Sequence, residues 1–133
     1  MTDLKLIRIL ENLHRLERKI CPILSEAGLT LAQLRLMRQI IESEPVASSR
    51  LSDALGITRA SITGQIKDLE KLGYTASNPN PEDGRSSLIS LSSQGRQRLE
   101  SVLQRVAKLE TLLDDALLAP LAQTLNQLTH SLD

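Results

Sequence analysis

Apolar residues in the first third of the chain recur at three- and four-residue steps, which is the spacing of one face of an α-helix. The first such pattern runs from Leu6 to Leu24 and is followed by Gly28, a typical C-cap residue. A second pattern follows Thr30 and continues to about residue 41. Thr30 and Gln33 have the spacing of a capping box. We therefore expect a long N-terminal helix and a shorter second helix.

The C-terminal third has the same helical spacing. Its apolar positions run from Leu99 to Leu117 and resume after Pro120. Ser92 or Ser93 is expected to open this last long helix. We expect Pro120 to break or kink it after residue 118, because proline lacks the backbone donor and collides with the preceding turn. The sequence thus predicts a leucine-lined helix at each end of the chain, with the C-terminal one divided in two.

Between these ends the pattern predicts two helices joined by a tight turn. Ser48 or Ser49 is expected to cap a short helix over residues 50–55, which stops at Gly56. Thr58 is expected to cap a further helix that ends at Gly73. A short helix, a turn and a second helix make a helix-turn-helix. The side chains expected to pack between its two helices are Leu51, Ala54, Leu55, Ile62, Ile66 and Leu69.

The helical spacing of apolar residues ends after the helix-turn-helix. Residues 74–77 are a short stretch, residues 78–84 are dense in turn formers, and residues 87–91 are apolar within polar surroundings. We interpret these segments as a β-hairpin with a long polar tip. The order of four helices, a hairpin and two helices predicts a mainly α fold with a small β-hairpin, in the α+β class.

The second helix of the helix-turn-helix leaves one face free. At 100° per residue, the positions turned away from the core are Ala60, Gly64, Lys67 and Lys71. They are flanked by Ser61, Thr63 and Asp68, and Arg59 lies in the first turn. Hydroxyls and the helix N-terminus can bind phosphates, and Arg59 can reach a base edge. Gly64 either permits close approach or is a tolerated residue that costs about 1 kcal/mol of helix stability. Lys67 alone would indicate only a solvated surface, but beside a helix-turn-helix it suggests neutralisation of backbone phosphates.

Composition narrows the class of partner. The 133 residues are 41% hydrophobic and 24% charged, so the chain can bury a core of its own. Tyr74 is the only aromatic residue, which argues against single-strand binding by base stacking. The net charge is zero, but residues 46–98 carry seven Lys and Arg against five Asp and Glu, and residues 99–133 carry two against five. A net charge of zero is not typical of a nucleic-acid-binding protein, and the middle of the chain is only mildly basic.

Several motifs in this order resemble the MarR family. They are the run Gly28-Leu-Thr-Leu-Ala-Gln33, the helix-turn-helix, the run Leu69-Glu-Lys-Leu-Gly73-Tyr74, and Asp83-Gly-Arg85 with a small-residue strand and a Leu-Ser-Ser-Gln-Gly helix start. The resemblance covers about residues 28–96. It implies a winged helix-turn-helix DNA-binding domain over residues 29–97. It also implies an N-terminal dimerisation helix over residues 1–28 and C-terminal dimerisation helices over residues 98–133.

The resemblance also assigns roles in the hairpin, or wing. Arg85 at its tip would enter the minor groove, where a concentrated negative potential favours arginine. Asp83 would hold Arg85 there by an ion pair. The alternative is a mobile surface arginine in a loop of glycine and proline. Gly64 and Gly84 stand where the family often has basic or polar residues, which implies weaker binding with a shallower salt dependence. The expected DNA-contacting residues are Ser49, Thr58, Arg59, Ala60, Ser61, Thr63, Gly64, Lys67, Arg85 and Ser86.

These observations predict a sequence-specific regulator of transcription that binds double-stranded DNA. By resemblance it would be a homodimeric repressor of a pseudo-palindromic operator, released by a ligand or another signal. One alternative left open is a winged-helix module that binds protein and acts as an antiregulator without its own operator. The terminal apolar stripes could instead close the core of a monomer. A small-molecule effector is also left open. The single aromatic side chain gives little support for a pocket that binds an aromatic ligand.

No catalytic, cofactor or metal site is expected. His14 and His130 lie on opposite terminal helices, and spacing suggests no Ser/His/Asp or Cys/His set. Cys21 has no second cysteine to pair with, and a buried structural cysteine is expected rather than a redox sensor. No apolar run is long enough to span a membrane, and the first residues lack the apolar region of a secretory signal. We therefore expect no membrane partner and a cytoplasmic location.

Overall fold

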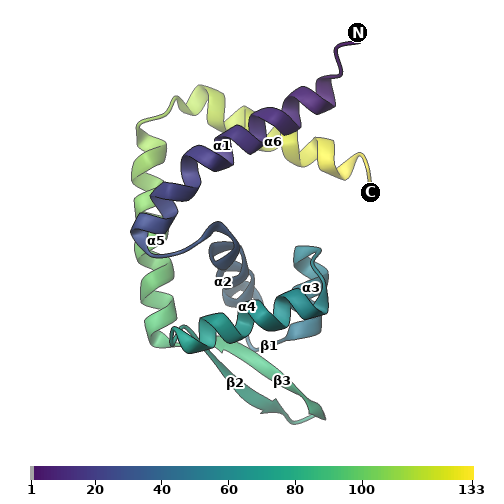
Figure 1. Ribbon diagram of the computed structural model, residues 1–133, viewed down its shortest axis with the longest axis vertical. Coiled ribbons are helices and arrows are strands. Elements are labelled where there is room, and N and C mark those ends of the chain that lie inside the picture. Colours follow the sequence, from purple (N-terminus) through teal and green to yellow (C-terminus); the bar gives the residue numbers. More distant parts are fainter. Residues whose placement is uncertain (1) are drawn as a thin grey trace. The chain divides into compact units, whose positions relative to one another are not determined.

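Residues 2–133 are described by the computed structural model, and they form two units that divide within one long helix, after Val102. The fold is mainly helical with one small antiparallel sheet, as the sequence predicts (Figure 1). The elements in chain order are α1 (Lys5–Ala27), α2 (Leu31–Ser43), β1 (Val46–Ala47), α3 (Ser48–Leu55), α4 (Arg59–Lys71), β2 (Thr75–Asn80), β3 (Asp83–Leu91), α5 (Ser93–Thr111) and α6 (Asp115–His130).

The first two helices end and begin where local capping residues require it. Gly28 follows α1 in the left-handed conformation, with φ 112°, and its N–H donates to the carbonyl oxygens of Leu24 and Ser25. The Gln33 N–H donates to Thr30 Oγ1 at 3.1 Å, and the Thr30 N–H donates to Gln33 Oε1 at 3.0 Å. The predicted C-cap and capping box are therefore confirmed.

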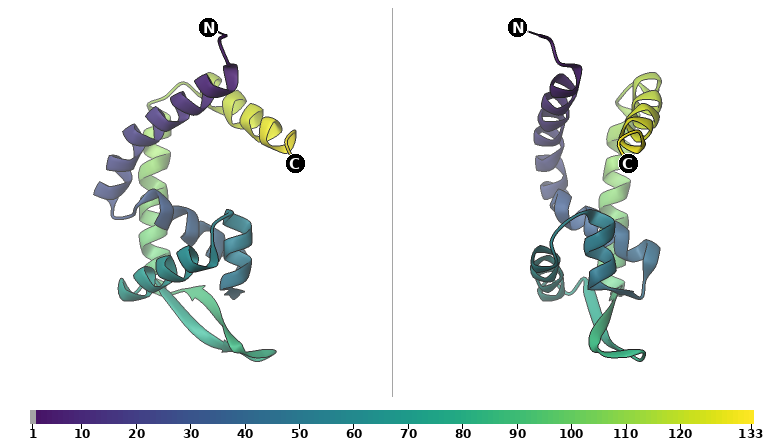
Figure 2. Two further views of the ribbon diagram at one scale, coloured as in Figure 1. Left: turned by 45° about the vertical axis from the view of Figure 1, so that its right-hand side comes forward. Right: turned by 90° about the vertical axis from the view of Figure 1, so that its right-hand side faces the viewer.

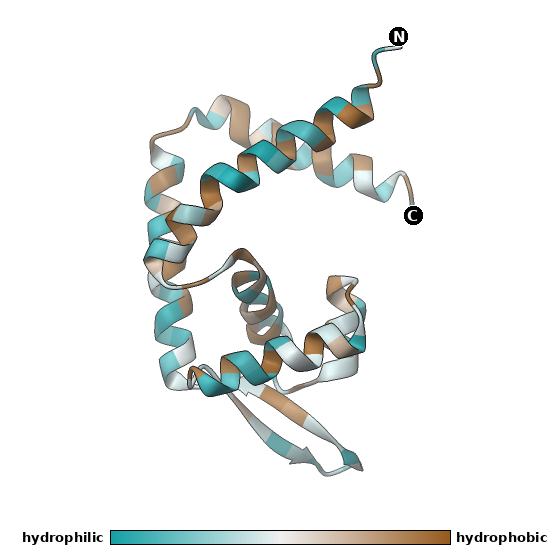
Figure 3. Ribbon diagram, in the orientation of Figure 1, coloured by the Kyte–Doolittle hydropathy of each residue, from teal (hydrophilic) through white to brown (hydrophobic). Residues whose placement is uncertain are grey.

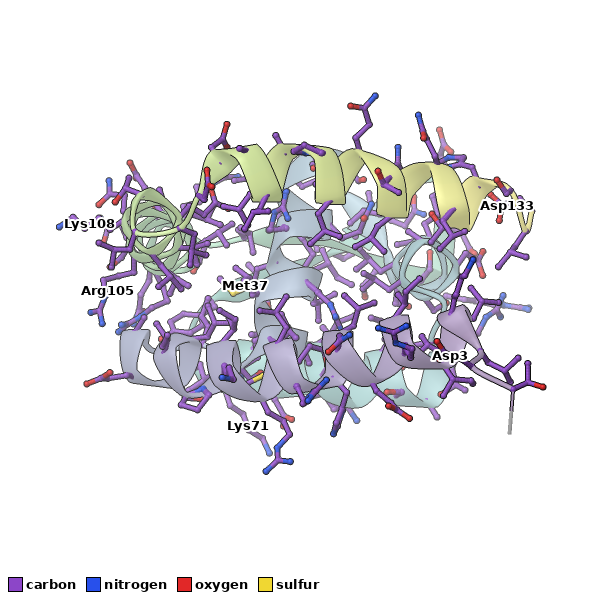
Figure 4. The ribbon with its side chains drawn as sticks, turned by 90° about the horizontal axis from the view of Figure 1, so that it is seen from above. Asp3, Met37, Lys71, Arg105, Lys108 and Asp133 are labelled. Carbon is purple, nitrogen blue, oxygen red and sulfur yellow. The ribbon has the colours of Figure 1, made fainter. Side chains whose placement is uncertain are left out.

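The helix-turn-helix consists of α3 and α4, with Gly56 at the turn in the left-handed conformation. Its two helices contact each other, Leu51 of α3 and Ile62 of α4 are fully buried, and Leu55 is half-buried. The fully or nearly fully buried side chains of the two helices include Leu51, Ile62, Ile66 and Leu69. Further inside this unit, Met37 of α2 is completely buried (Figure 4).

Two expectations for α3 are wrong. Its N-cap is Ala47, which makes no side-chain cap, so neither Ser48 nor Ser49 caps the helix. Ala54 is exposed, whereas Ser52 is buried and donates its hydroxyl to the Ser49 carbonyl oxygen at 2.8 Å. The buried and half-buried positions of α3 are 48, 49, 51, 52 and 55, and four of them (48, 51, 52 and 55) follow the helical spacing of i, i+3, i+4 and i+7. A hydroxyl that bonds within its own helix can occupy such a position at low cost.

The wing is an antiparallel sheet of three strands in the order β1-β3-β2. Its β2–β3 hairpin projects away from the helices of its unit (Figure 2). The expected long polar tip is wrong, because β2 continues to Asn80 and β3 begins at Asp83, so the turn is residues 81–82. Pro79 is tolerated within β2 because this strand is at the edge of the sheet. The ladder shifts register at Pro79/Asn80.

The break in the C-terminal helices lies before the predicted position. Helix α5 ends at Thr111, and α6 begins after Asp114, whose carboxylate accepts a hydrogen bond from the Ala116 N–H at 2.9 Å. Pro120 lies inside α6, so the expected break after residue 118 is wrong. An N-cap Asp satisfies one of the free backbone donors of a helix start, and this local signal fixed the start of α6.

Hydrophobic residues recur along the terminal helices (Figure 3). Many of their leucines stay exposed. Leu10 on α1 is 60% exposed and Leu117 on α6 is 70% exposed, and no side chain of α6 is buried. The exposed large apolar residues of these segments are Leu4, Leu6, Ile7, Leu10, Leu16, Leu103, Leu112, Leu113, Leu117, Leu121 and Leu132. The apolar stripe of α6 is therefore not closed within its own unit.

Candidate nucleic-acid interface

The N-terminal end of α4 is built by a side-chain cap. Thr58 Oγ1 accepts a hydrogen bond from the Ser61 N–H at 3.1 Å, as the sequence predicts. Because Ile62 and Ile66 point into the core, the opposite face of α4 is turned to the surface. The exposed residues from the cap through this face include Thr58, Arg59, Ala60, Ser61, Thr63, Gly64 and Lys67.

The hydroxyl groups on this face differ in whether their hydrogen is free to be donated to a partner. Thr63 donates its hydroxyl to the Arg59 carbonyl oxygen at 2.8 Å, so that hydrogen is used within the helix. Ser61 Oγ accepts from Gln65 Nε2 at 3.2 Å and keeps its own hydrogen for another acceptor. Ser61 is therefore the better phosphate donor of the two.

Gly64 opens the middle of the exposed face of α4. A Cβ built at this position meets no atom within 4 Å, so packing inside the chain does not require glycine there. The same is true of Gly84 in the wing. A partner surface can therefore approach the α4 backbone at Gly64 closely, with no side chain in between.

Hydrogen bonds of the turn hold the wing tip. Asp83 Oδ1 accepts from the Arg85 backbone N–H at 3.0 Å, and Asn80 Oδ1 accepts from the Glu82 N–H at 3.0 Å. Asn80 Nδ2 donates to Ser86 Oγ at 3.1 Å, and that hydroxyl donates to the Asp83 carbonyl oxygen at 3.3 Å. The structure thus places Asp83 beneath the backbone of Arg85 rather than in an ion pair with its guanidinium.

Sequence reasoning missed Asn80, although a signal for it was present. An Asn followed by Pro is a typical start of a turn, because the Asn side chain can accept from the backbone two residues later. In this wing the Asn80 amide bridges the turn to Ser86, which is half-buried. Ser86 is therefore occupied in the turn, whereas the Arg85 side chain is exposed near the tip, as are those of Glu82 and Asp83.

The cationic side chains of this surface are unpaired. Among residues 2–133, the ion pairs join Arg8 to Asp3, Arg35 to Glu17 and Arg96 to Glu44. None of them uses Arg59, Lys67 or Arg85, and these three side chains are exposed. Their charge is therefore available to a polyanion.

The wing is fastened to α4 and α2 by contacts that the sequence did not predict. Ser77 on β2 donates its hydroxyl to Glu70 Oε1 on α4 at 3.0 Å. Glu44, at the end of α2, accepts from the Leu91 N–H at 2.9 Å and pairs with Arg96. These bonds fix the sheet relative to the helix whose face is exposed.

Ser49 is apart from the face of α4. It lies in the first turn of α3 and is half-buried, and its carbonyl oxygen accepts from Ser52. A groove of about 580 Å³ separates the outer side of α3 from the wing. Its apolar lining includes Pro45, Leu51 and Leu88.

Other kinds of site have little support in the described part of the chain. In residues 2–133 no three His, Cys, Asp or Glu side chains are grouped as a metal site would need. Cys21 is half-buried and is a free thiol. None of the helices described for this chain has both the length and the apolarity to cross a membrane.

The chain is similar in sequence to known regulators. The MarR family model matches residues 27–86. An uncharacterized HTH-type transcriptional regulator of Bacillus cereus is 30% identical over 115 residues, which cover 86% of this chain and 74% of that protein. The uncharacterized HTH-type transcriptional regulator YdgJ of Bacillus subtilis is 32% identical over 74 residues, 56% of this chain. That match spans 45% of the length of YdgJ.

Solved structures of this kind share the fold. A mutant MarR from E. coli, complexed with operator DNA, has a TM-score of 0.78 at 22% identity, covering 96% of this chain and 99% of that one. The PcaV regulator of Streptomyces coelicolor, in complex with its natural ligand, has a TM-score of 0.75 at 17% identity, with both chains covered completely. The arrangement of α3, α4 and the wing is therefore one that occurs in proteins of known structure.

Proposed function

Because the chain belongs to the MarR family of DNA-binding transcription regulators, which are not enzymes, we propose that it binds a specific duplex sequence as a homodimer and represses transcription there. The observation that carries this proposal is the exposed, unpaired face of α4 beside a wing that ends in the exposed Arg85. A helix and a projecting hairpin on one rigidly bonded unit can occupy two adjacent grooves of a duplex.

We assign α4 to the major groove. Its first turn offers the backbone donors of a helix N-terminus, the Ser61 hydroxyl and the Arg59 guanidinium. Lys67, two turns later on the exposed side, would neutralise a backbone phosphate. Gly64 would let the helix backbone approach the bases, since nothing in the chain fills the space beside it.

We assign the wing to the minor groove. Arg85 is exposed near the two-residue turn, and its backbone is held by Asp83. A guanidinium gains most where the groove is narrow and its negative potential is concentrated. The cation contacts phosphate oxygens and the groove floor, and the Asp83 carboxylate acts through the backbone conformation of the tip.

The homodimer is supported by the apolar side chains of the terminal helices. Leu10 and Leu117 are 60% and 70% exposed, and α6 buries no side chain at all. Exposed apolar stripes of this extent mark association surfaces. We therefore propose that residues 1–28 and 98–133 make the dimer and that residues 29–97 bind DNA. A two-fold dimer with one reading helix per protomer binds half-sites about 34 Å apart, so the operator is a pseudo-palindrome.

We propose that an effector or another signal releases the operator. The groove of about 580 Å³ is lined by residues of α3 and of the wing, including Arg50, Asp53 and Glu82. A small molecule in this groove would touch the wing, which is assigned to DNA contact, and α3, which packs against α4. Its occupation would therefore change operator affinity through the position of the wing.

Selection from a random duplex library with the full chain, at two salt concentrations, tests the proposal. An enriched pseudo-palindrome is the expected result. With three free cationic side chains per protomer, the logarithm of affinity should fall with the logarithm of salt with a slope of about −5. The matched control is Arg38→Ala, which removes an exposed cation from α2, outside the assigned surface. It should leave the enriched sequence unchanged.

Failure to enrich any duplex at low salt contradicts the proposed function. Capture of one defined protein partner instead, with no DNA bound, would establish the antiregulator alternative. Enrichment of single half-sites without a palindrome would keep DNA binding and reject the dimer.

A further inference from the structure

Arg98 connects three separate elements of the N-terminal unit. It lies on α5, and its Nε donates to Tyr74 Oη at 3.2 Å. Its Nη1 donates to the Ala27 carbonyl oxygen at 3.2 Å. Ala27 is the last residue of α1, and Tyr74 directly precedes β2. One guanidinium therefore joins the end of α1 to the root of the wing.

Gly28 fits against this guanidinium. A Cβ built at Gly28 would lie 2.5 Å from Arg98 Nη1 and 3.1 Å from its Cζ. The backbone of Gly28 also has a φ of 112°, which L side chains rarely adopt. The bare Cα thus allows the C-terminus of α1 and the Arg98 side chain to meet closely.

Charge favours the same contact. The last carbonyl groups of a helix carry a partial negative charge and lack partners within the helix. Helix α1 has no basic residue in its last turn, so it does not supply a cation of its own there. Arg98 supplies that cation from α5 and donates to the buried residue that ends α1.

The fully buried contacts of α1 lie at its C-terminal end, and side chains such as Ile20 and Ile23 are only half-buried. Of the side chains of α1, only Leu24 and Ala27 are buried, and both are at its C-terminal end. The ion pair of Glu17 with Arg35 is 49% and 59% exposed, and exposed pairs hold weakly. The direction of α1 relative to the rest of its unit therefore depends mainly on the contacts at residues 24–28, and a rotation there displaces its N-terminal end like a lever.

The lever is long enough for a small rotation to matter. About 25 Å of helix separates Glu11 from Gly28, at 1.5 Å per residue. A rotation of about 10° at Gly28 would displace Glu11 by about 4 Å. If α1 helps to form the dimer, the same rotation changes the separation of the two α4 helices.

We propose that Arg98 is a positioning residue for DNA binding. By fastening Ala27 to Tyr74 it fixes the angle between α1 and the winged helix-turn-helix, and so sets the distance at which a dimer presents its two α4 helices. Arg98 itself does not touch DNA. This inference rests on the dimeric operator binding proposed above for its effect on affinity, but its effect on the angle can be measured without DNA.

The angle is measured by pulsed dipolar spectroscopy on the full chain. Spin labels are attached at Glu11→Cys on α1 and Lys71→Cys on α4, in a Cys21→Ser background. Both sites are exposed, and the Lys71 side chain points outwards (Figure 4). Doubly labelled chains are diluted into an excess of unlabelled protein, so that only distances within one chain contribute. Arg98→Met should broaden or shift the distance distribution by several ångström, as the lever estimate implies.

A matched control separates this effect from the loss of any arginine on α5. Arg105→Met removes a cation seven residues later on almost the same face of the helix, and Arg105 extends outwards from α5 (Figure 4). It should leave the distribution unchanged. Tyr74→Phe keeps the ring and deletes one acceptor, so it should give a smaller broadening even if Arg98→Met folds poorly. A narrow, unshifted distribution in both Arg98→Met and Tyr74→Phe overturns the proposal.

The functional readout is the preferred spacing of the half-sites. Wild-type protein should lose affinity steeply when one or two base pairs are inserted between half-sites. Arg98→Met should bind the optimal operator about five- to tenfold more weakly, a change of the size of one ordinary hydrogen bond. It should also discriminate less between spacings, while its affinity for one half-site is unchanged. Arg98→Lys keeps the charge and one reachable acceptor, so it should recover part of the discrimination.

The two proposals fail in different ways. If the wild type enriches no duplex, the proposed function fails, and the label distances still decide the role of Arg98. If the wild type prefers one spacing and Arg98→Met prefers it equally, DNA binding stands and Arg98 is only a structural residue.

Discussion

Substitution of glycine by alanine is expected to have opposite effects on stability at two positions of this chain. Gly95 lies in the first turn of α5, where a Cβ would be 2.1 Å from the Tyr74 carbonyl oxygen and 2.9 Å from its carbon. Gly64 lies within α4, where a Cβ would meet nothing within 4 Å. Gly95→Ala should therefore destabilise the protein, and Gly64→Ala should stabilise it.

The magnitudes follow from the contacts. The atoms that a Cβ at Gly95 would meet are backbone atoms, so α5 or the residue before β2 has to move by about 1 Å. Overpacking of this kind costs about 1–3 kcal/mol, sometimes more, and alanine in place of glycine in a helix returns up to about 1 kcal/mol. We expect a net loss of about 2 kcal/mol for Gly95→Ala. Without any clash, Gly64→Ala should gain about 1 kcal/mol.

Thermal unfolding followed by circular dichroism measures both variants at one fixed protein concentration, because association would otherwise shift the transition. At about 4 °C per kcal/mol for a chain of this size, the Tm should fall by about 8 °C for Gly95→Ala and rise by about 4 °C for Gly64→Ala. An unchanged Tm for Gly95→Ala would refute the close approach of α5 to Tyr74. Operator affinity of the Gly64→Ala variant then tests a separate point, since a gain in stability with a loss of affinity assigns Gly64 to close approach of DNA.

Three further predictions concern the DNA surface, the sheet and the dimer. Arg85→Ala should weaken operator binding at least tenfold, the loss of about 1.4 kcal/mol, while melting and oligomeric state stay unchanged; fluorescence anisotropy measures this, and unchanged affinity would remove the wing from the interface. Glu44→Ala should lower the free energy of unfolding by about 1–3 kcal/mol, because the Leu91 N–H and Arg96 both lose their acceptor. Urea denaturation measures this change. A change below about 0.5 kcal/mol, as expected at ordinary surface sites, would contradict the prediction. Leu117→Asp should convert a dimer to monomers in sedimentation velocity without loss of helix content. The Leu117 side chain is 70% exposed, so its replacement should cost a monomer little stability. A persistent dimer would place the interface elsewhere.

The sequence by itself determined the features that depend on residues close together in the chain. Gly28 ended α1, Thr30 and Gln33 capped α2, and Thr58 capped α4, because each cap is complete within about four residues. The helix-turn-helix followed from helical spacing, and its buried face on α4 was correct. The exposed face of α4 followed from the same spacing.

Features that depend on distant partners were decided only by the tertiary structure. Strand β1 has two residues and exists because Val46 and Ala47 pair with β3, about forty residues later. The wing was longer than expected because pairing with β3 carried β2 through Pro79. The break between α5 and α6 is a different case, because two local signals competed there and the Asp114 cap, rather than Pro120, fixed its position.

The same reason explains which residues of the interface could be found. Arg59, Lys67 and Arg85 are recognisable because their charge and position lie in local motifs. Glu44 and Arg98 are not, because their partners are 47 and 71 residues away along the chain. A local pattern carries no information about such contacts, since only the packing of the folded chain brings the donor to its acceptor. The sequence therefore determined which face of α4 is exposed, and the tertiary structure decided how rigidly that face is held.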